Sequence, residues 1–245
     1  MNMGELAIQL EDVSLTFPRG RALWRPGFQA LKRISCRIDH GDRVGVIGRN
    51  GAGKSTLLQI IADVLAPDAG RIVRRHGVCQ LLNLNLGFLP HLTGRENAIM
   101  SGLLQGYERQ EIDARLDAIR EFSELGEFFG APYRTYSSGM KARLGFSTAL
   151  QFEPDILLID EILGVGDKVF QEKSRRALQE RIHSGVTVVL VSHSEDLVRN
   201  LCTHAMWIEH GETQMYGLVD DVLTPYRDAN PVPPARSRHL PRNPP

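Results

Sequence analysis

The chain has little of what marks secreted or membrane-spanning proteins. It has three cysteines, Cys36, Cys79 and Cys202, which lie far apart and form no C-x-x-C pair. Such an odd, scattered set suits a reducing cytosol and argues against a disulfide framework or a zinc site. No apolar run approaches the ~20 residues needed to cross a bilayer. The N-terminus carries Glu5 and Glu11 and lacks a signal-peptide pattern, so any work at a membrane needs another chain to span it.

An excess of charge of one sign is also missing. Lys and Arg total 29, as do Asp and Glu, which leaves a net charge of zero over 245 residues. This balance gives no argument for a general nucleic-acid-binding surface, although a local patch stays open, and we expect no nucleic-acid partner. The sequence shows no internal repeat or heptad run, and its length gives room for one substantial domain, with or without a subdomain.

What the chain does contain is a glycine-rich turn between a strand and a helix. The β-branched run Val44–Ile47 predicts a buried parallel strand, and apolar residues at helical spacing follow the turn. Within the turn, Gly48, Gly53, Lys54 and Ser55 satisfy the pattern G-x-x-x-x-G-K-[ST]. A turn that binds nothing is the alternative, and the strand before it and the helix after it argue against that interpretation.

Each position in this turn suits a bound phosphate. The glycines let several backbone N–H groups converge on one anion, and the helix N-terminus adds its partial positive charge. Lys54 can reach the β- and γ-phosphates of a nucleotide, and Ser55 can place its hydroxyl on Mg²⁺. The residues expected to hold the nucleotide are Gly48, Arg49, Asn50, Gly51, Ala52, Gly53, Lys54, Ser55 and Thr56.

Two runs that alternate apolar and polar residues, 6–17 and 30–39, predict strands of a small antiparallel β layer ahead of the turn. Three aromatic side chains, Phe17, Trp24 and Phe28, lie in or near the connection between them. One of them can stack on an adenine ring, and ordinary packing explains them equally well. Phe17 is the first choice for stacking.

The segment from about 91 to 152 has mainly helical periodicity. It opens at Thr93, with Glu96 three residues further on, which matches a capping box. Because strand patterns lie on both sides of it, we interpret this segment as a helical subdomain inserted into the sheet-forming part of the chain.

Strand and helix then alternate, with strands predicted at 156–160 and 186–192 and a helix at 169–183. Such alternation around a phosphate loop predicts an α/β fold with a parallel core sheet flanked by helices. We expect one domain over residues 1–228. The proline-rich tail at 229–245 cannot build a core, and we expect it to be disordered.

Polar groups end two of the predicted strands. Asp160 and Glu161 follow an apolar run, at the sheet edge where the phosphate loop opens. Adjacent strand positions point in different directions, so Asp160 can face a metal while Glu161 faces an attacking water, two roles that phosphoryl transfer needs. His193 ends the next strand, where it can touch a γ-phosphate or hold the water. The alternatives are that Asp160 and Glu161 are solvated acids at a strand end and that His193 is a capping or surface residue.

The sequence Tyr-Ser-Ser-Gly-Met at 136–140 starts a helix with small hydroxyl residues. Lys141 and Arg143 fall in its first turn, where cations oppose the helix dipole. A phosphate docked at Ser137, Ser138 and the exposed amides would relieve this conflict. Since the chain already has one phosphate loop, a second anion site makes sense if it closes over the nucleotide of another subunit. Plain serine capping is the alternative.

Taken together, these motifs resemble the nucleotide-binding subunit of an ABC transporter over residues 5–217. The segment 48–55 matches the Walker A loop of that family, 136–140 matches its signature motif, and 156–161 matches Walker B with the catalytic glutamate. The resemblance implies a P-loop NTPase of ABC-type architecture that uses ATP and Mg²⁺.

Further segments extend the resemblance to the ABC transporter family and indicate a group within it. The segment 164–167 falls at the D-loop, which makes Asp167 an implied nucleotide contact, and His193 falls at the switch histidine. Thr93–Asn97, taken with the Tyr-Ser-Ser-Gly-Met motif, is similar to exporters of bacterial surface polysaccharides, a group that includes capsule, O-antigen and teichoic-acid systems.

The chain departs from the family pattern at two motifs. The Q-loop glutamine, which serves Mg²⁺ and the water, corresponds to Asn83 or Asn85, whose shorter amides reach less far. In the signature, Ser138 stands where glycine is usual and Met140 where glutamine is usual. Both signature changes recur in the polysaccharide-export group.

The resemblance also implies roles for single residues. Glu161 is the base or water-orienting group, Lys54 stabilises the transferring charge and His193 senses the γ-phosphate. Mg²⁺ is held by Ser55 and Asp160. The further expected ligands are Asn83 for Mg²⁺ and Ser137, Ser138 and Gly139 for the nucleotide of the opposite copy.

The implied assembly is a homodimer of ATPase subunits on two copies of a multi-spanning permease, at the cytoplasmic face of the bacterial inner membrane. The permease handles the polysaccharide. One rival function is a soluble ABC-type ATPase acting on nucleic acid or ribosomes, which coiled coils or tandem nucleotide domains would support. The other is a P-loop kinase or small-molecule enzyme, which would not need the motif at 136–140.

Overall fold

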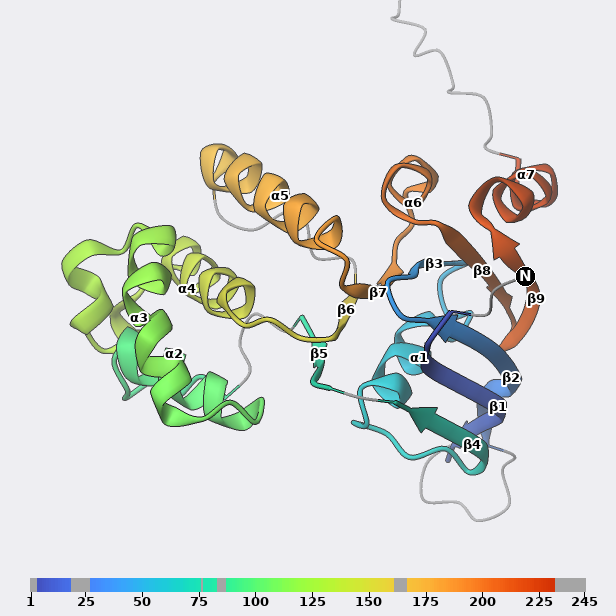
Figure 1. Cartoon of the computed structure of the whole chain (residues 1–245), viewed down its shortest axis with the longest axis horizontal. Coiled ribbons are helices and arrows are strands. Elements are labelled where there is room, and N and C mark those ends of the chain that lie inside the picture. The colour runs from blue at the N-terminus through green and yellow to red at the C-terminus, as the bar shows by residue number, and fades with distance from the viewer. Residues whose placement is uncertain (1–3, 19–26, 76, 83–86, 161–166, 232–245) are drawn as a thin grey trace, which may run out of the picture.

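Figure 1 shows the computed structural model, which describes residues 4–18, 27–75, 77–82, 87–160 and 167–231. Three strands form an antiparallel layer in the order β2-β1-β4. These strands are β1 Leu6–Phe17, β2 Phe28–Asp39 and β4 Ala69–Arg74. The two strands predicted from the alternating runs are confirmed.

A six-stranded sheet forms the centre of the fold, in the order β5-β6-β7-β3-β8-β9. Its neighbouring strands are parallel except for β8 and β9, which form an antiparallel hairpin. In chain order the strands are β3 Arg43–Ile47, β5 Cys79–Leu81, β6 Ile156–Asp160, β7 Thr187–Val191, β8 His204–Glu209 and β9 Glu212–Leu218. The predicted parallel core is confirmed.

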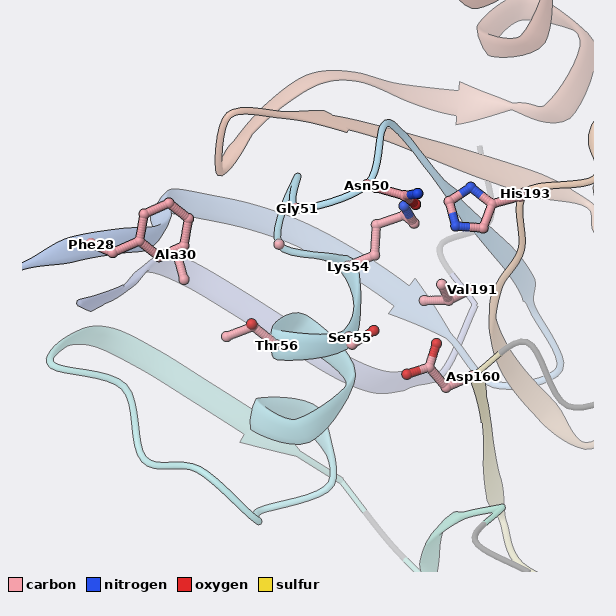
Figure 2. Close-up of a pocket in the computed structure, with 11 residues that line it drawn as sticks. Phe28, Ala30, Asn50, Gly51, Lys54, Ser55, Thr56, Asp160, Val191 and His193 are labelled. Atoms are coloured by element: carbon pink, nitrogen blue, oxygen red, sulfur yellow. The ribbon is translucent and has the colours of Figure 1, made fainter. Parts of the chain in front are cut away.

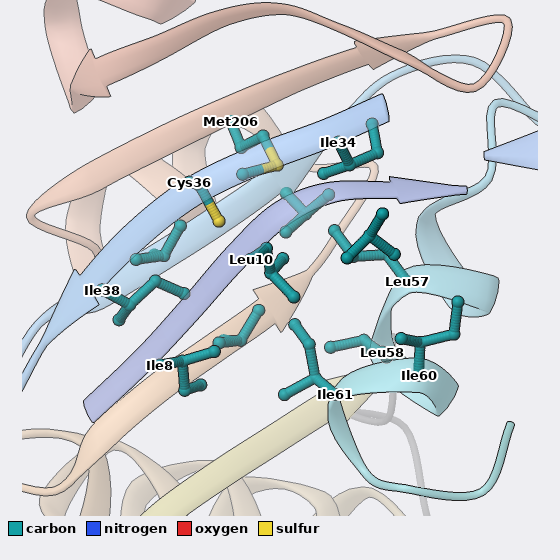
Figure 3. Packing of buried hydrophobic residues seen from close by; sticks show 14 of the residues in the cluster. Ile8, Leu10, Ile34, Cys36, Ile38, Leu57, Leu58, Ile60, Ile61 and Met206 are labelled. Atoms are coloured by element: carbon teal, nitrogen blue, oxygen red, sulfur yellow. The ribbon is translucent and has the colours of Figure 1, made fainter. Parts of the chain in front are cut away.

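Both faces of this sheet are covered, because its central strands are apolar on both sides. Leu158 packs on the face covered by α1 (Lys54–Ile61) and the antiparallel layer, the cluster drawn in Figure 3. Its neighbour Leu157 packs on the opposite face, against α5 (Lys168–Ile182) and α6 (Glu195–Leu201). This two-sided burial holds the carboxyl ends of the parallel strands at one edge.

Another group of helices lies together beside the sheet, to its left in Figure 1, around an apolar cluster of its own. They comprise α2 Gly94–Leu104, α3 Arg109–Ser123, two 3₁₀ turns at Gly126–Gly130 and Tyr133–Thr135, and α4 Ser138–Gln151. The predicted capping box is present, since Thr93 Oγ1 accepts from Glu96 N at 3.1 Å and Thr93 N donates to the Glu96 carboxylate at 2.8 Å.

One helix was not expected from the sequence. Helix α7 (Val219–Ala229) packs Val222 and Leu223, both 0% exposed, against the sheet, and Pro225 inside it obscures the helical pattern. The residues after 231 lie outside the part of the chain that the structure describes, so the division into a domain over 1–228 and a disordered tail stays a prediction.

All three cysteines are free thiols. Burial raises the pKa of Cys36 and of Cys202 to about 12, so both thiols stay protonated at neutral pH. The expectation that these cysteines build no disulfide framework is confirmed.

Candidate functional site

One pocket collects eight of the residues that the sequence assigns to phosphate and metal chemistry. The cavity measures about 310 Å³. It is lined by Phe28, Ala30, Asn50, Gly51, Gly53, Lys54, Ser55, Thr56, Asp160, Val191 and His193. Figure 2 shows Lys54, Asp160 and His193 converging toward one end of this pocket, with Phe28 at the other.

Sheet topology explains this convergence. Strands β3, β6 and β7 are parallel neighbours, with Asp160 paired to Val191 across β6 and β7 and Val46 paired to Val191 across β3 and β7. The residues that follow these strands therefore meet at one sheet edge, where ligands bind in open α/β folds. Three segments far apart in sequence form one site because of this register.

The loop before α1 needs its glycines. Gly48, Gly51 and Gly53 have φ angles of 148°, 78° and 108°, which side-chain-bearing residues rarely adopt. A Cβ on Gly48 would lie 2.0 Å from the carbonyl oxygen of Ile208, and one on Gly53 would lie 2.6 Å from that of Ala30. The loop is thus held against β8 and β2 in one conformation, with its turns fixed by packing.

Lys54 is the buried cation of the site. Its side chain lies inside the loop, the residue is 6% exposed, and Nζ donates to the carbonyl oxygens of Gly48 at 2.7 Å and Arg49 at 3.0 Å. The N-cap of α1, Gly53, has no side chain to cap the helix, and its first turn holds no acidic residue. The helix start therefore offers its N–H groups and a cation to an anion, as the sequence predicts.

Ser55 and Asp160 line the same pocket from α1 and β6. A hydroxyl and a carboxylate are oxygen donors of the kind that Mg²⁺ takes while it keeps phosphate and water ligands, so these two residues fit that cation. Among the residues described, no cluster of three His, Cys, Asp or Glu side chains could hold a metal ion. Two other residues assigned to this chemistry, Glu161 and Asn83, lie outside the described residues.

His193 reaches the pocket from a defined turn after β7. The Ser192 hydroxyl accepts from Ser194 N at 3.1 Å, and Ser194 Oγ caps α6 by accepting from Leu197 N at 3.2 Å. These two bonds on either side of His193 fix the backbone that carries it. The imidazole is exposed and lines the pocket, and its contact with a γ-phosphate stays a prediction.

The aromatic side chain in the pocket is Phe28, and Phe17 is not among the lining residues. The two residues are partners in the β1–β2 register, and they are 38% (Phe17) and 45% (Phe28) exposed. Trp24 lies outside the described residues. Adenine stacking by Phe17 stays a prediction, and the geometry adds Phe28 as a second candidate.

The signature segment lies away from this pocket. Ser137 caps α4, with its Oγ accepting from Met140 N at 3.2 Å, so the plain-capping alternative describes part of its role. Ser137 and Ser138 are exposed, and a Cβ on Gly139 would have only Ser137 Oγ near it, at 3.9 Å. The start of α4 is therefore an open surface, and nucleotide contacts from it stay a prediction.

The charge conflict expected in the first turn of α4 is resolved differently from the sequence prediction. Arg143 forms ion pairs with Glu124 at 2.7 Å and with Asp167 at 2.5 Å, and Lys141 lies over the ring of Tyr133 at 5.2 Å. These contacts satisfy both cations within the chain. A docked phosphate is therefore not required to balance these cations, and phosphate docking at Ser137 and Ser138 stays a prediction.

Sequence reasoning also missed the end of α7. Arg49 of the phosphate loop donates from Nε to Asn230 Oδ1 at 3.0 Å, and Arg227 donates to the Glu195 carboxylate at 2.8 Å. The C-terminal helix thus contacts both the loop and the helix that follows His193. No sequence signal could have found the first contact, since 181 positions separate its two residues.

This arrangement belongs to the ABC transporter ATPases. The family model described as ABC transporter matches residues 31–164, more than half of the chain, and the chain is a member of that family. A solved dimeric structure of a bacterial ABC transporter cassette superposes with a TM-score of 0.68 at 25% identity, covering 86% of this chain and 98% of that one. The chain is accordingly an ABC-type ATPase that binds ATP, with hydrolysis coupled to transport.

Curated relatives narrow the group. An O-antigen export system ATP-binding protein, RfbB of Klebsiella pneumoniae, is 44% identical over 202 residues, which is 82% of each chain. A teichoic acids export ATP-binding protein, TagH of Lactococcus lactis, is 44% identical over 199 residues, covering 81% of this chain and 42% of the relative. The resemblance to polysaccharide-export ATPases is thereby confirmed.

Proposed function

We propose that this protein is the ATP-hydrolysing motor of an exporter that moves a bacterial surface polysaccharide of capsule, O-antigen or teichoic-acid type across the inner membrane. The names of the RfbB and TagH relatives support this substrate class. The motor works as a homodimer on two copies of a membrane permease, at the cytoplasmic face. None of the described helices is long and apolar enough to cross a membrane, which fits a separate spanning subunit.

The observation that supports a dimer is a nucleotide site that is only half complete within one copy of the chain. The pocket holds Lys54, Asp160 and His193 but none of the residues at 137–139, of which Ser137 and Ser138 lie exposed at the start of α4. In the homodimer, the α4 start of one copy covers the ATP bound by the other. The γ-phosphate then joins both halves by charge-assisted hydrogen bonds, and its loss on hydrolysis releases them.

The residues in the pocket divide the work of hydrolysis. Lys54 exchanges its loop carbonyls for phosphate oxygens and stabilises charge as it moves to the leaving group. Ser55 and Asp160 hold Mg²⁺, which neutralises phosphate charge when bound. Glu161 orients and deprotonates the attacking water, and His193 contacts the γ-phosphate.

A second, apolar cavity suits the permease. It measures about 430 Å³ and is lined by Gln59, Ala62, Val64, Val78, Cys79, Gln80, Leu81, Leu104 and Gln105. Val64 and Leu104 are 63% and 58% exposed, and Gly87 lies so close to Leu104 that a Cβ there would be 2.2 Å from its Cδ1. A cytoplasmic segment of the permease fills this cavity and touches the loop before α2.

The test is a purification from membranes in mild detergent through a tagged copy, followed by ATPase assays. We expect a multi-spanning partner in stoichiometric amount, and ATPase activity that is lost in Glu161→Gln. A glycan or lipid that remains attached identifies the cargo. RNA, ribosomes or no partner at all would overturn the export role while leaving the phosphate chemistry in place.

A further inference from the structure

Four charged side chains join three helices at the junction between the helical part and the sheet. Arg143 of α4 pairs through Nη1 with Glu124 at 2.7 Å and through Nη2 with Asp167 at 2.5 Å. Glu124, at the C-terminal end of α3, also accepts from Lys173 of α5 at 2.7 Å. One guanidinium therefore holds two carboxylates that belong to different parts of the molecule.

The surroundings of Arg143 favour this geometry over solvation. Its side chain is 19% exposed and its guanidinium lies 4.9 Å from the centre of the Phe170 ring. Lys173 lies over the Phe122 ring in the same way, at 4.5 Å. A planar guanidinium can bind two carboxylates and stack at the same time, which a lysine ammonium cannot reproduce.

Asp167 is the second end of this connection. Its Oδ1 caps α5 by accepting from Val169 N at 3.1 Å and Phe170 N at 3.0 Å, while Oδ2 takes the Arg143 contact. Asp167 thus fixes where α5 begins, on the sheet side of the junction. Arg143 lies on α4, whose N-cap Ser137 and first residue Ser138 are both exposed.

We propose that Arg143 is a positioning residue for hydrolysis. It couples the contact between α4 and the ATP of the partner copy to the position of the first residues of α5 in its own chain. Asp167 receives this coupling through the ion pair and not through its capping bonds. The inference rests on the dimeric ATPase of the proposed function and is independent of the exported glycan. Loss of the pair lowers kcat and leaves the binding of ATP to a single copy unchanged.

A double-mutant cycle tests whether Arg143 and Asp167 act on hydrolysis through their ion pair or each independently of the other. Asn caps helices as well as Asp does, so Asp167→Asn keeps the cap of α5 and removes only the charge. Arg143→Met removes the other partner while retaining bulk over Phe170. The matched control is the exposed pair Arg176–Glu180 on α5, at 3.0 Å, changed by Arg176→Met and Glu180→Gln.

We expect each single change at the Arg143–Asp167 pair to lower kcat by roughly tenfold, and the double change to lower it by the same factor rather than by their product. The Kd of a fluorescent ATP analogue for Glu161→Gln copies held below the dimerisation concentration should not change, and the control variants should match the wild type. Factors that multiply in the double variant, or a kcat within about twofold of wild type in both singles, would overturn the proposal. A wild-type protein without ATPase activity would instead refute the proposed function.

Discussion

The two helix starts that the chain offers to phosphate, at α1 and at α4, are built in opposite ways. The loop before α1 leaves no room for a Cβ at Gly48 or Gly53, and it encloses Lys54 at 6% exposure. At the start of α4, a Cβ on Gly139 meets only Ser137 Oγ at 3.9 Å, and both serines are exposed.

This difference shows how the two motifs divide the recognition of ATP. A site that binds phosphate without help from a second subunit has to fix its backbone amides in advance, because ordering them on binding would cost affinity. The loop before α1 meets that demand through packing against β2 and β8. The start of α4 keeps its own serine cap and an open face, as expected for a surface completed by another molecule.

The largest effect should follow a change inside the enclosed loop. Lys54→Ala removes the charge that stabilises the transferring phosphoryl group, and we expect ATP hydrolysis to fall by roughly 10³-fold. Phosphate release measured at saturating Mg-ATP gives the rate, and an unchanged melting temperature shows that the fold persists. Retention of more than about a tenth of the activity would contradict the role given to Lys54.

A change on the open face should break hydrolysis while sparing the loop. Ser138→Arg adds bulk where the structure has space, so the fold and the Kd of one copy for ATP should be unaffected. We expect hydrolysis to fall by roughly 10²-fold, since the second half of the site is blocked. Titration of a fluorescent ATP analogue and steady-state ATPase assays on the same preparation would show whether the two effects separate.

Substitutions at the end of the pocket expected to hold the adenine ring distinguish the two aromatic candidates for stacking. Phe28 lines the cavity and Phe17 does not, so Phe28→Ala should raise the KM for ATP by roughly fivefold through lost stacking, against less than twofold for Phe17→Ala. A larger effect from Phe17→Ala would support the choice made from sequence. GTP should respond like ATP, because stacking does not read the edges of the base.

The smallest effect concerns the pH dependence of stability, which involves the carboxylates paired with Arg143 of α4. Hydrogen bonds from Lys173 and Arg143 lower the pKa of Glu124, and the bond from Arg143 lowers that of Asp167. Carboxyl pKa values that are lowered on folding stabilise the protein above the unfolded values of about 4, and this contribution disappears as the pH falls through the folded values.

The melting temperature of the wild type should therefore drop more between pH 7 and about pH 3 than that of Arg143→Met, which lacks the pair. Thermal unfolding by circular dichroism over this range makes the comparison, and Arg176→Met serves as the control. Parallel curves for the wild type and Arg143→Met would show that the ion pairs do not contribute.

Local patterns predicted the loop, β6 with Asp160 and the turn with His193, because each is a short motif between regular elements. Contacts that depend on register or long-range packing were not accessible in the same way. Phe28 lies in the pocket while its cross-strand partner Phe17 does not, and the contact between Arg49 and Asn230 joins residues 181 positions apart. The sequence showed Arg143 as a misplaced cation, since its partners Glu124 and Asp167 come from other helices.

The most direct test of the half-complete site is the mass of Glu161→Gln in solution with and without ATP, measured by sedimentation. We predict a monomer without ATP, a dimer with ATP, and a monomer in both conditions when Ser138→Arg is added, with ATP still bound. A Glu161→Gln protein that binds ATP and stays monomeric, or whose dimer ignores Ser138→Arg, would contradict the assignment of α4 to the partner's nucleotide.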